Sequence, residues 1–136
     1  MSTWMGYVKL YALTVPVFFA VDMVWLGLVA KTFYRTRLGN LLRPDVNWPA
    51  ALAFYFIYIA GILIFAVVPN LDHGSLGRCL LWGALFGFFT YATYDLTNLA
   101  TLKGWPASVA IVDILWGVVL CTAVSASSYA IGRWLG

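Results

Sequence analysis

Four long stretches of apolar residues alternate with short polar segments along the chain. They cover residues 10–30, 46–71, 79–102 and 104–132, and each contains at most one charged residue. A helix needs about 20 mostly apolar residues to cross a bilayer, and inside the hydrocarbon its backbone polar groups must bond within the helix. The pattern predicts an all-α, polytopic membrane protein with one domain over residues 1–136. We expect four transmembrane helices in an antiparallel bundle, near 7–31, 49–69, 79–102 and 106–132.

The composition supports this fold class and excludes others. Of 136 residues, 63% are hydrophobic and only 10% are charged, and the mean hydropathy is +0.89. A soluble domain carries about 25% charged residues. These values exclude a soluble globular protein, a disordered chain and a nucleic-acid-binding domain. The lipid bilayer is therefore the expected partner.

Proline and glycine residues mark the helix boundaries and contacts. Pro49 fits the first turn of the second helix, where its missing N–H costs little, and the pair 69–70 predicts the end of that helix. The short link 103–106 makes the third and fourth helices antiparallel neighbours. Gly83 and Gly87 form a G-x-x-x-G pair, which lets another helix approach closely.

The basic residues are distributed unevenly over the two ends of the predicted bundle. Five lie at the end that holds the first loop (Lys31, Arg35, Arg37, Arg43, Lys103), and three lie at the other end (Lys9, Arg78, Arg133). The positive-inside rule then predicts that loop 31–48 is cytoplasmic and that both termini lie outside. Five tryptophans near the helix ends fit an aromatic belt at the two interfaces: Trp4, Trp48, Trp82, Trp105 and Trp134.

Three aspartates interrupt the apolar spans. Asp22, Asp95 and Asp113 lie in the first, third and fourth spans, at depths of roughly 12, 10 and 9 Å from the cytoplasmic border at 1.5 Å per residue. Ionisable groups inside a span usually face the bundle and often mark function. With no Lys or Arg at this level, either burial keeps some of them protonated or a bound cation compensates. The alternative is that protonated aspartates only hydrogen-bond between helices.

Polar and aromatic residues surround these aspartates in the predicted bundle. Residues three or four apart share a helix face, so Tyr91, Tyr94 and Asn98 accompany Asp95, while the second helix adds Tyr55. Trp25 and Trp116 each follow an aspartate by three residues, which favours a partnership of the first and fourth helices. The candidate ligand- or cation-binding set is therefore Asp22, Asp95, Asp113, Tyr55, Tyr91, Tyr94, Asn98, Trp25 and Trp116.

The basic loop 31–48 is the second candidate site. It is either a positive-inside anchor, including a short helix in the interface, or a site for lipid headgroups, whose phosphates Arg35, Arg37 and Arg43 would attract. Cys79 and Cys121 are better explained as small packing residues than as a disulfide. The sequence contains no zinc-ligand spacing and no nucleotide-binding fingerprint, so we expect neither a metal nor a cofactor.

Several segments together resemble a known family. These are residues 21–27, 47–51, 87–98 and 113–117, among which the run around Tyr91, Tyr94 and Asp95 is the most specific. They look like the bacterial "domain of unknown function 2177" membrane proteins, over essentially the whole chain. The resemblance implies a small bacterial inner-membrane protein and assigns no catalytic residue. Some relatives lie beside genes for fatty-acid modification, which links the family to lipid metabolism only by association.

Three functions remain open at this point. The first is a carrier or binding protein for a proton, a cation or an amine-bearing molecule, which would need a homodimer if it transports, because four helices enclose little volume. The second is an enzyme or accessory subunit of membrane-lipid modification, for which no nucleophile–base pair is visible. The third is a structural partner in a membrane complex, docked on the small residues Gly117, Cys121, Ser128 and Gly132. We favour the first.

Overall fold

The computed structural model describes residues 3–136 as a set of long helices joined by short links. The first helical segment contains α1 (Trp4–Trp25), the π-helical turn η1 (Leu26–Ala30), α2 (Lys31–Leu38) and the 3-10 turn η2 (Gly39–Leu41). The second contains α3 (Trp48–Ile62), the π-helical turn η3 (Leu63–Val67) and α4 (Val68–Asp72). Two uninterrupted helices follow, α5 (Leu76–Thr101) and α6 (Ala107–Leu135). No strand occurs in these described residues, which confirms the all-α class.

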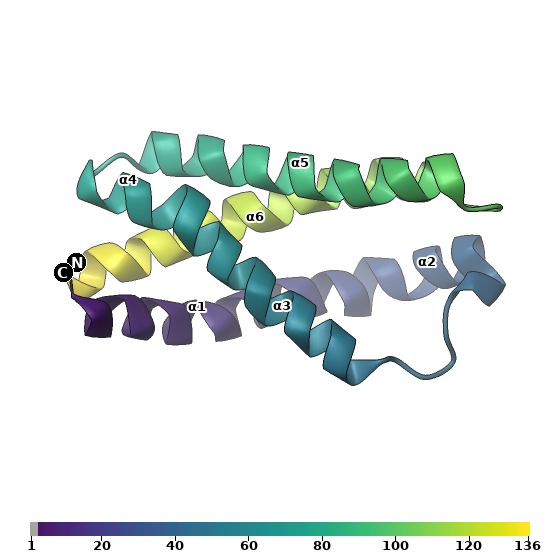
Figure 1. The fold of residues 1–136 in the computed structure, drawn as a ribbon, viewed down its shortest axis with the longest axis horizontal. Coiled ribbons are helices and arrows are strands. Elements are labelled where there is room, and N and C mark those ends of the chain that lie inside the picture. Colours follow the sequence, from purple (N-terminus) through teal and green to yellow (C-terminus); the bar gives the residue numbers. More distant parts are fainter. Residues whose placement is uncertain (1–2) are drawn as a thin grey trace.

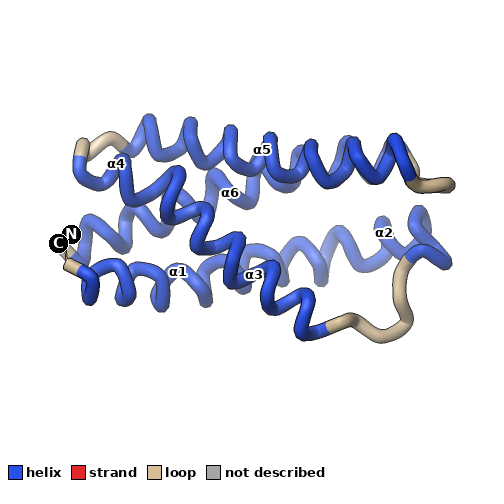
Figure 2. The backbone as a smooth tube through the Cα atoms, viewed as in Figure 1, coloured by secondary structure: helices blue, strands red, loops and turns tan. Residues whose placement is uncertain are grey.

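The helices run up and down along one long axis (Figures 1 and 2). The start of α1 and the end of α6 lie at one end of the bundle, and α2 lies at the other. α5 and α6 run side by side, as the short link between them predicts, and they share the most extensive packing in the molecule. The segment that contains α3 and α4 crosses the bundle diagonally. Its α4 end lies close to α5, and the start of α3 lies away from α5.

Three of the long helical segments are apolar enough to cross a membrane. They are Trp4–Leu41, Trp48–Asp72 and Ala107–Leu135. Large apolar side chains on them face outward, as in Leu28 and Ile57, which are 80% and 73% exposed. α5 has 26 residues, enough for a fourth span, but its Tyr, Thr and Gly residues make it less apolar. Its status as a fourth span therefore stays a prediction from its length and its place beside α6.

Side-chain caps explain where the helices begin. Thr3 accepts a hydrogen bond from the Gly6 N–H at the start of α1, at 3.1 Å. Asn47 caps α3 in the same way, and Pro49 lies in the first turn as predicted. Ser75 caps α5 by accepting from the backbone N–H of Arg78 at 3.2 Å. Each cap satisfies a backbone donor that has no partner inside its helix.

The first helix was predicted to end near residue 31, which is wrong. It continues through the π-helical turn η1 into α2, and the helical segment ends at Leu41. No proline or glycine interrupts Lys31–Leu38, so the backbone continues until Gly39, whose φ of 51° is a conformation that glycine readily adopts. Most of the predicted basic loop is therefore an extension of the first helix.

The second helix was predicted to end at Pro69, and it continues instead to Asp72. Pro69 lies in the first turn of α4, directly after the π-helical turn η3. The Asn70 side chain donates to the Ala66 carbonyl at 2.7 Å and satisfies that acceptor within the membrane segment. The segment ends in a Schellman motif, in which Gly74 has a φ of 65° and its N–H bonds to the Leu71 carbonyl at 3.1 Å.

The glycine pair of α5 forms the close contact that its spacing predicts. A Cβ atom on Gly87 would overlap the Gly117 carbonyl oxygen and would lie 2.9 Å from Cβ of Cys121. A Cβ atom on Gly83 would lie 2.8 Å from Cβ of Ser125. Only glycine at these positions lets the two helix backbones approach so closely.

The small residues of α6 are used inside this chain. Cys121 is fully buried against α5 and is a free thiol, so the disulfide alternative is wrong. The Ser128 and Thr14 hydroxyls hydrogen-bond at 2.8 Å between α6 and α1. Gly132 is packed against the Leu71 side chain. This stripe is therefore buried inside the chain and is not free to dock a helix of another protein.

Candidate functional site

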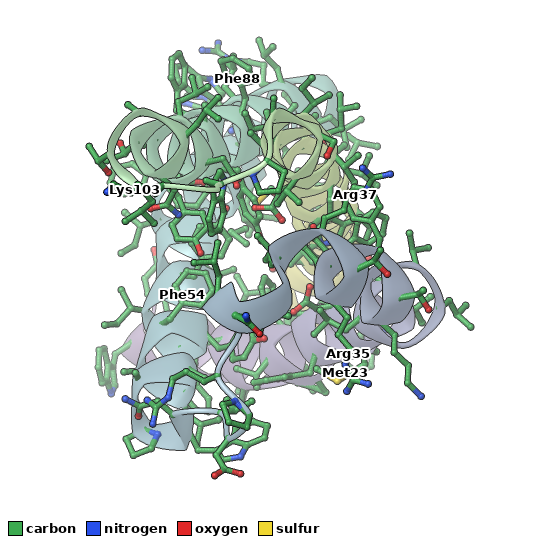
Figure 3. The ribbon with its side chains drawn as sticks, turned by 90° about the vertical axis from the view of Figure 1, so that its right-hand side faces the viewer. Met23, Arg35, Arg37, Phe54, Phe88 and Lys103 are labelled. Atoms are coloured by element: carbon green, nitrogen blue, oxygen red, sulfur yellow. The ribbon has the colours of Figure 1, made fainter. Side chains whose placement is uncertain are left out.

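A large cavity lies at the α2 end of the bundle. Its volume is about 1070 Å³, and residues from α1, α2, α3, α5, α6 and the loop before α3 line it. Figure 3 looks along the bundle from this end, with Arg35 on α2 and Phe54 on α3 among the labelled residues. Seven of the nine residues expected to bind a ligand line this cavity: Asp22, Trp25, Tyr55, Tyr91, Tyr94, Asp113 and Trp116. Asp95 and Asn98 lie outside the lining.

Two tryptophans join α1 to α6 at the wall of the cavity. The rings of Trp25 and Trp116 stack with centroids 4.5 Å apart and an angle of 5° between their planes. The Trp116 Nε1–H donates to Oδ1 of Asp22 at 3.3 Å. The matching Asp-x-x-Trp spacings in α1 and α6 predicted this helix partnership. The hydrogen bond joins Trp116 to the aspartate of the other helix, not to the aspartate of its own helix.

Asp113 is held by a residue that the sequence analysis missed. The Tyr34 hydroxyl donates to Oδ1 of Asp113 at 2.7 Å, and Tyr34 also lines the cavity. Tyr34 reaches this place because the first helix continues into α2. A π-helical turn such as η1 adds one residue and rotates the following helix by about 100°. The absence of proline and glycine from Lys31–Leu38 is a sequence signal for the continuation, whereas the rotation has no plain signal in the sequence.

Asp95 lies behind the cavity wall. Its side chain is fully buried, and neither carboxyl oxygen has a hydrogen-bond partner among residues 3–136. It lies near enough to Asp113 for the two carboxyl groups to interact. Trp105 lines the cavity, and its buried indole Nε1–H has no partner within hydrogen-bond distance, although the indole lies near enough to Asp95 to interact with it. Unpaired buried polar groups are costly and call for an explanation, which function often supplies.

The three aspartates do not form a single cluster. Asp22 and Asp113 share the cavity and interact electrostatically, whereas Asp95 lies outside the lining and interacts with Asp113 and Trp105, which belong to it. Within the described residues, no group of three His, Cys, Asp or Glu side chains could hold a metal ion. Two of the three carboxyl groups thus line the cavity, and the third lies beside one of them.

A hydrogen-bonded tyrosine closes the cavity toward the middle of the bundle. The Tyr58 hydroxyl lies 2.7 Å from the Thr90 hydroxyl and 3.0 Å from Sγ of Cys121. Tyr58 is buried, and both Tyr58 and Thr90 line the cavity. These contacts tie α3, α5 and α6 together at the inner limit of the cavity.

Basic side chains line the outer part of the cavity. Lys31, Arg35 and Arg43 belong to the lining and are exposed. Arg37, which was expected to act with them, lies elsewhere. Its guanidinium stacks over the Phe33 ring at 4.6 Å and donates to the Ser108 hydroxyl at 3.2 Å. The cavity thus carries acidic groups inside and positive charge at its outer end.

The cavity has an apolar opening between α3 and α5. Phe54 on α3 and Tyr94 on α5 line it and are 47% and 56% exposed. The two helices diverge toward this end of the bundle (Figure 1). An amphipathic molecule could therefore place its polar group among the aspartates while its apolar part remains in the bilayer.

The fold and the cavity define an all-α membrane protein with an internal acidic pocket. The chain belongs to the family of predicted membrane proteins described as domain of unknown function 2177, whose model matches residues 7–130. Neither a curated protein nor a solved structure matches the chain.

Proposed function

We propose that this protein binds an amine-bearing amphipathic molecule, with Asp22 and Asp113 as the site for its ammonium group. The observation that supports this most is that both carboxyl groups line one cavity, while their hydrogen bonds come from the neutral donors Trp116 and Tyr34. An ammonium group supplies three donors and the positive charge that these carboxyl groups lack. The stacked Trp25 and Trp116 rings add aromatic surface, which attracts cations.

The remaining lining supports an elongated ligand. Its apolar part would leave through the opening beside Phe54 and Tyr94. An anionic group on the same molecule would meet Lys31, Arg35 and Arg43 at the outer end. Pockets for small molecules combine an apolar wall with a few placed polar groups in this way.

Native mass spectrometry of the detergent-solubilised protein tests the proposal with dodecylamine and its uncharged analogue dodecanol. We expect the wild type to retain the amine and to retain little of the alcohol. Losing a hydrogen bond to a charged group costs about 1.5–3 kcal/mol, which is roughly a tenfold to hundredfold loss of affinity. Asp22→Asn and Asp113→Asn should each lose that much for the amine, and Asp72→Asn, at the other end of the bundle, should lose nothing. Equal retention of amine and alcohol by the wild type would contradict the proposal.

Transport of the same ligand, or of a proton or another cation, is an extension of this proposal. It requires a second opening, and a homodimer would provide the volume that four helices lack. Uptake of a fluorescent amine into proteoliposomes tests it, with Asp22→Asn as the inactive control. Binding without uptake would leave a binding protein only.

Modification of membrane lipids is the second candidate. The opening between α3 and α5 favours it, because a lipid there could bring a reactive group to Asp22 and Asp113, which could act as acid and base. The lipid profiles of a deletion strain and of the wild type should then differ. Identical profiles under acid and oxidative stress would exclude this role.

We also propose an inner-membrane orientation with residues 31–48 cytoplasmic and both termini outside. The larger number of Lys and Arg residues at the α2 end supports it. A cysteine introduced at Asp45 should react with a membrane-impermeant maleimide only after the cells are opened. Reaction in intact cells would reverse the orientation.

A further inference from the structure

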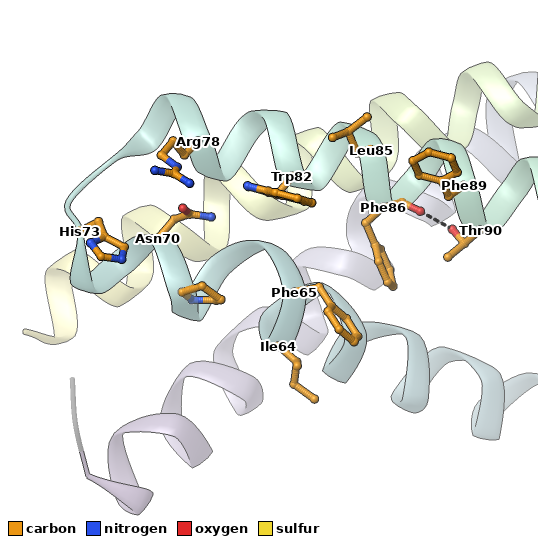
Figure 4. Close-up of a pocket in the computed structure, with 11 residues that line it drawn as sticks. Ile64, Phe65, Asn70, His73, Arg78, Trp82, Leu85, Phe86, Phe89 and Thr90 are labelled. Atoms are coloured by element: carbon orange, nitrogen blue, oxygen red, sulfur yellow. Dashed lines mark hydrogen bonds between the residues drawn. The ribbon is translucent and has the colours of Figure 1, made fainter.

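A second cavity lies toward the opposite end of α5, apart from the aspartates. It is a groove of about 510 Å³ between the η3–α4 segment and α5. Figure 4 shows its composition: His73 and Arg78 lie at the end near the α4–α5 turn, and aromatic side chains such as Trp82 and Phe86 continue along α5. The groove is therefore polar at one end and apolar along the rest of its length.

The length of the groove matches one leaflet of a bilayer. Arg78 and Phe89, both in its lining, are eleven residues apart on α5. This separation corresponds to about 16 Å at 1.5 Å per residue, and half of a hydrocarbon core is about 15 Å. With Arg78 at headgroup level, near the first turn of α5, Phe89 lies near the middle of the membrane.

The polar end of the groove has the chemistry of a phosphate site. The Arg78 guanidinium offers a planar fork of donors that fits phosphate oxygens, and the His73 ring can add a donor. Among the residues drawn in Figure 4, the one hydrogen bond joins Thr90 to the Phe86 carbonyl, so Arg78 and His73 are not engaged within the groove. Asp72, the nearest acid in sequence, does not belong to the lining.

We propose that this groove holds an anionic phospholipid of the leaflet at the α4–α5 end, with its phosphate on Arg78 and His73. One acyl chain lies along Trp82, Phe86 and Phe65. The groove adjoins the aspartate cavity at Thr90, which lines both, but no aspartate belongs to the lining of the groove. Binding here is independent of the amine site and persists when Asp22 and Asp113 are replaced.

Native mass spectrometry with phosphatidylglycerol and phosphatidylcholine of identical acyl chains tests this site. Phosphatidylcholine has the same phosphate but carries a neutralising choline. The wild type should retain phosphatidylglycerol in several-fold preference. Arg78→Gln should abolish the preference, whereas Arg133→Gln, which removes an arginine beside Gly74 outside the groove, should keep it.

A second variant tests the apolar part of the groove. Trp82 is 46% exposed, so Trp82→Ala removes part of the wall without opening the core. It should lower the retention of both lipids and leave the thermal midpoint unchanged. Equal retention of the two lipids by the wild type, an equal loss of preference in Arg78→Gln and Arg133→Gln, or association of lipid-free copies through this face would overturn the proposal.

Discussion

Gly87 makes the closest approach between α5 and α6, and its replacement by alanine tests the packing that holds Asp95 beside Asp113. A Cβ atom at Gly87 would overlap the Gly117 carbonyl oxygen and would lie 2.8 Å from its carbonyl carbon. Non-bonded carbon atoms prefer about 3.5–4.0 Å, so the helices must separate by roughly 0.7 Å or more. The nearest atoms belong to backbone, which cannot turn aside as a side chain can.

The size of the effect follows from two opposing terms. Replacing glycine by alanine inside a helix gains about 0.5–1 kcal/mol from the backbone alone. Overpacking a tight contact costs about 1–3 kcal/mol. Gly77, in the first turn of the same helix, has no atom within 4 Å of the position that a Cβ atom would occupy, so Gly77→Ala carries no overpacking cost and gains at most that amount. We therefore expect Gly87→Ala to be less stable than Gly77→Ala by about 1–3 kcal/mol.

The assay is reversible unfolding in mixed micelles at increasing fractions of sodium dodecyl sulfate, followed by far-ultraviolet circular dichroism. Both variants are compared with the wild type in the same detergent. Gly77→Ala should unfold at the wild-type fraction or above it, and Gly87→Ala clearly below it. If the two variants unfold together, the α5–α6 contact is looser than described, and the position of Asp95 beside Asp113 loses its support.

Three further predictions concern single contacts. Tyr34→Phe removes the donor to Asp113 and should lower the free energy of unfolding by about 1–2 kcal/mol in the same assay; an unchanged value would mean that the bond does not form. A double-mutant cycle of Thr14→Val and Ser128→Ala should give a coupling energy of about 0.6 kcal/mol, and purely additive effects would argue against the α1–α6 hydrogen bond. Cys121 is fully buried, so a maleimide should label it only after unfolding, and rapid labelling of the folded protein would show that the core is open.

Much of the fold could be predicted from the sequence, because spans of apolar residues are nearly independent of tertiary detail. The hydropathy pattern located the helices, and Gly83 and Gly87 identified the close α5–α6 contact. The two wrong boundaries, at residues 31 and 69, lie next to the π-helical turns η1 and η3. A π-helical turn depends on how the helix packs on its neighbours, and the linear pattern does not contain that information.

The sequence allows a prediction of how deep each candidate site residue lies along its span, but not of the direction in which its side chain faces. Counting residues along each span predicts that Asp22 and Asp113 lie at one level, because the rise per residue is constant, and both residues line the same cavity. Whether a side chain faces the cavity depends on the rotation of its helix, which packing determines. For this reason Asp95 lies behind the wall, and Tyr34 and Trp105 line the cavity without having been expected there.

Asp22 and Asp113 line one shared cavity, which we propose accepts an amine. The most direct measurement is labelling with a hydrophobic carbodiimide, followed by mass spectrometry of the peptides that contain each aspartate. We expect label on both residues, with dodecylamine protecting both and dodecanol protecting neither. Label on one residue alone, or label that the amine does not reduce, would contradict it.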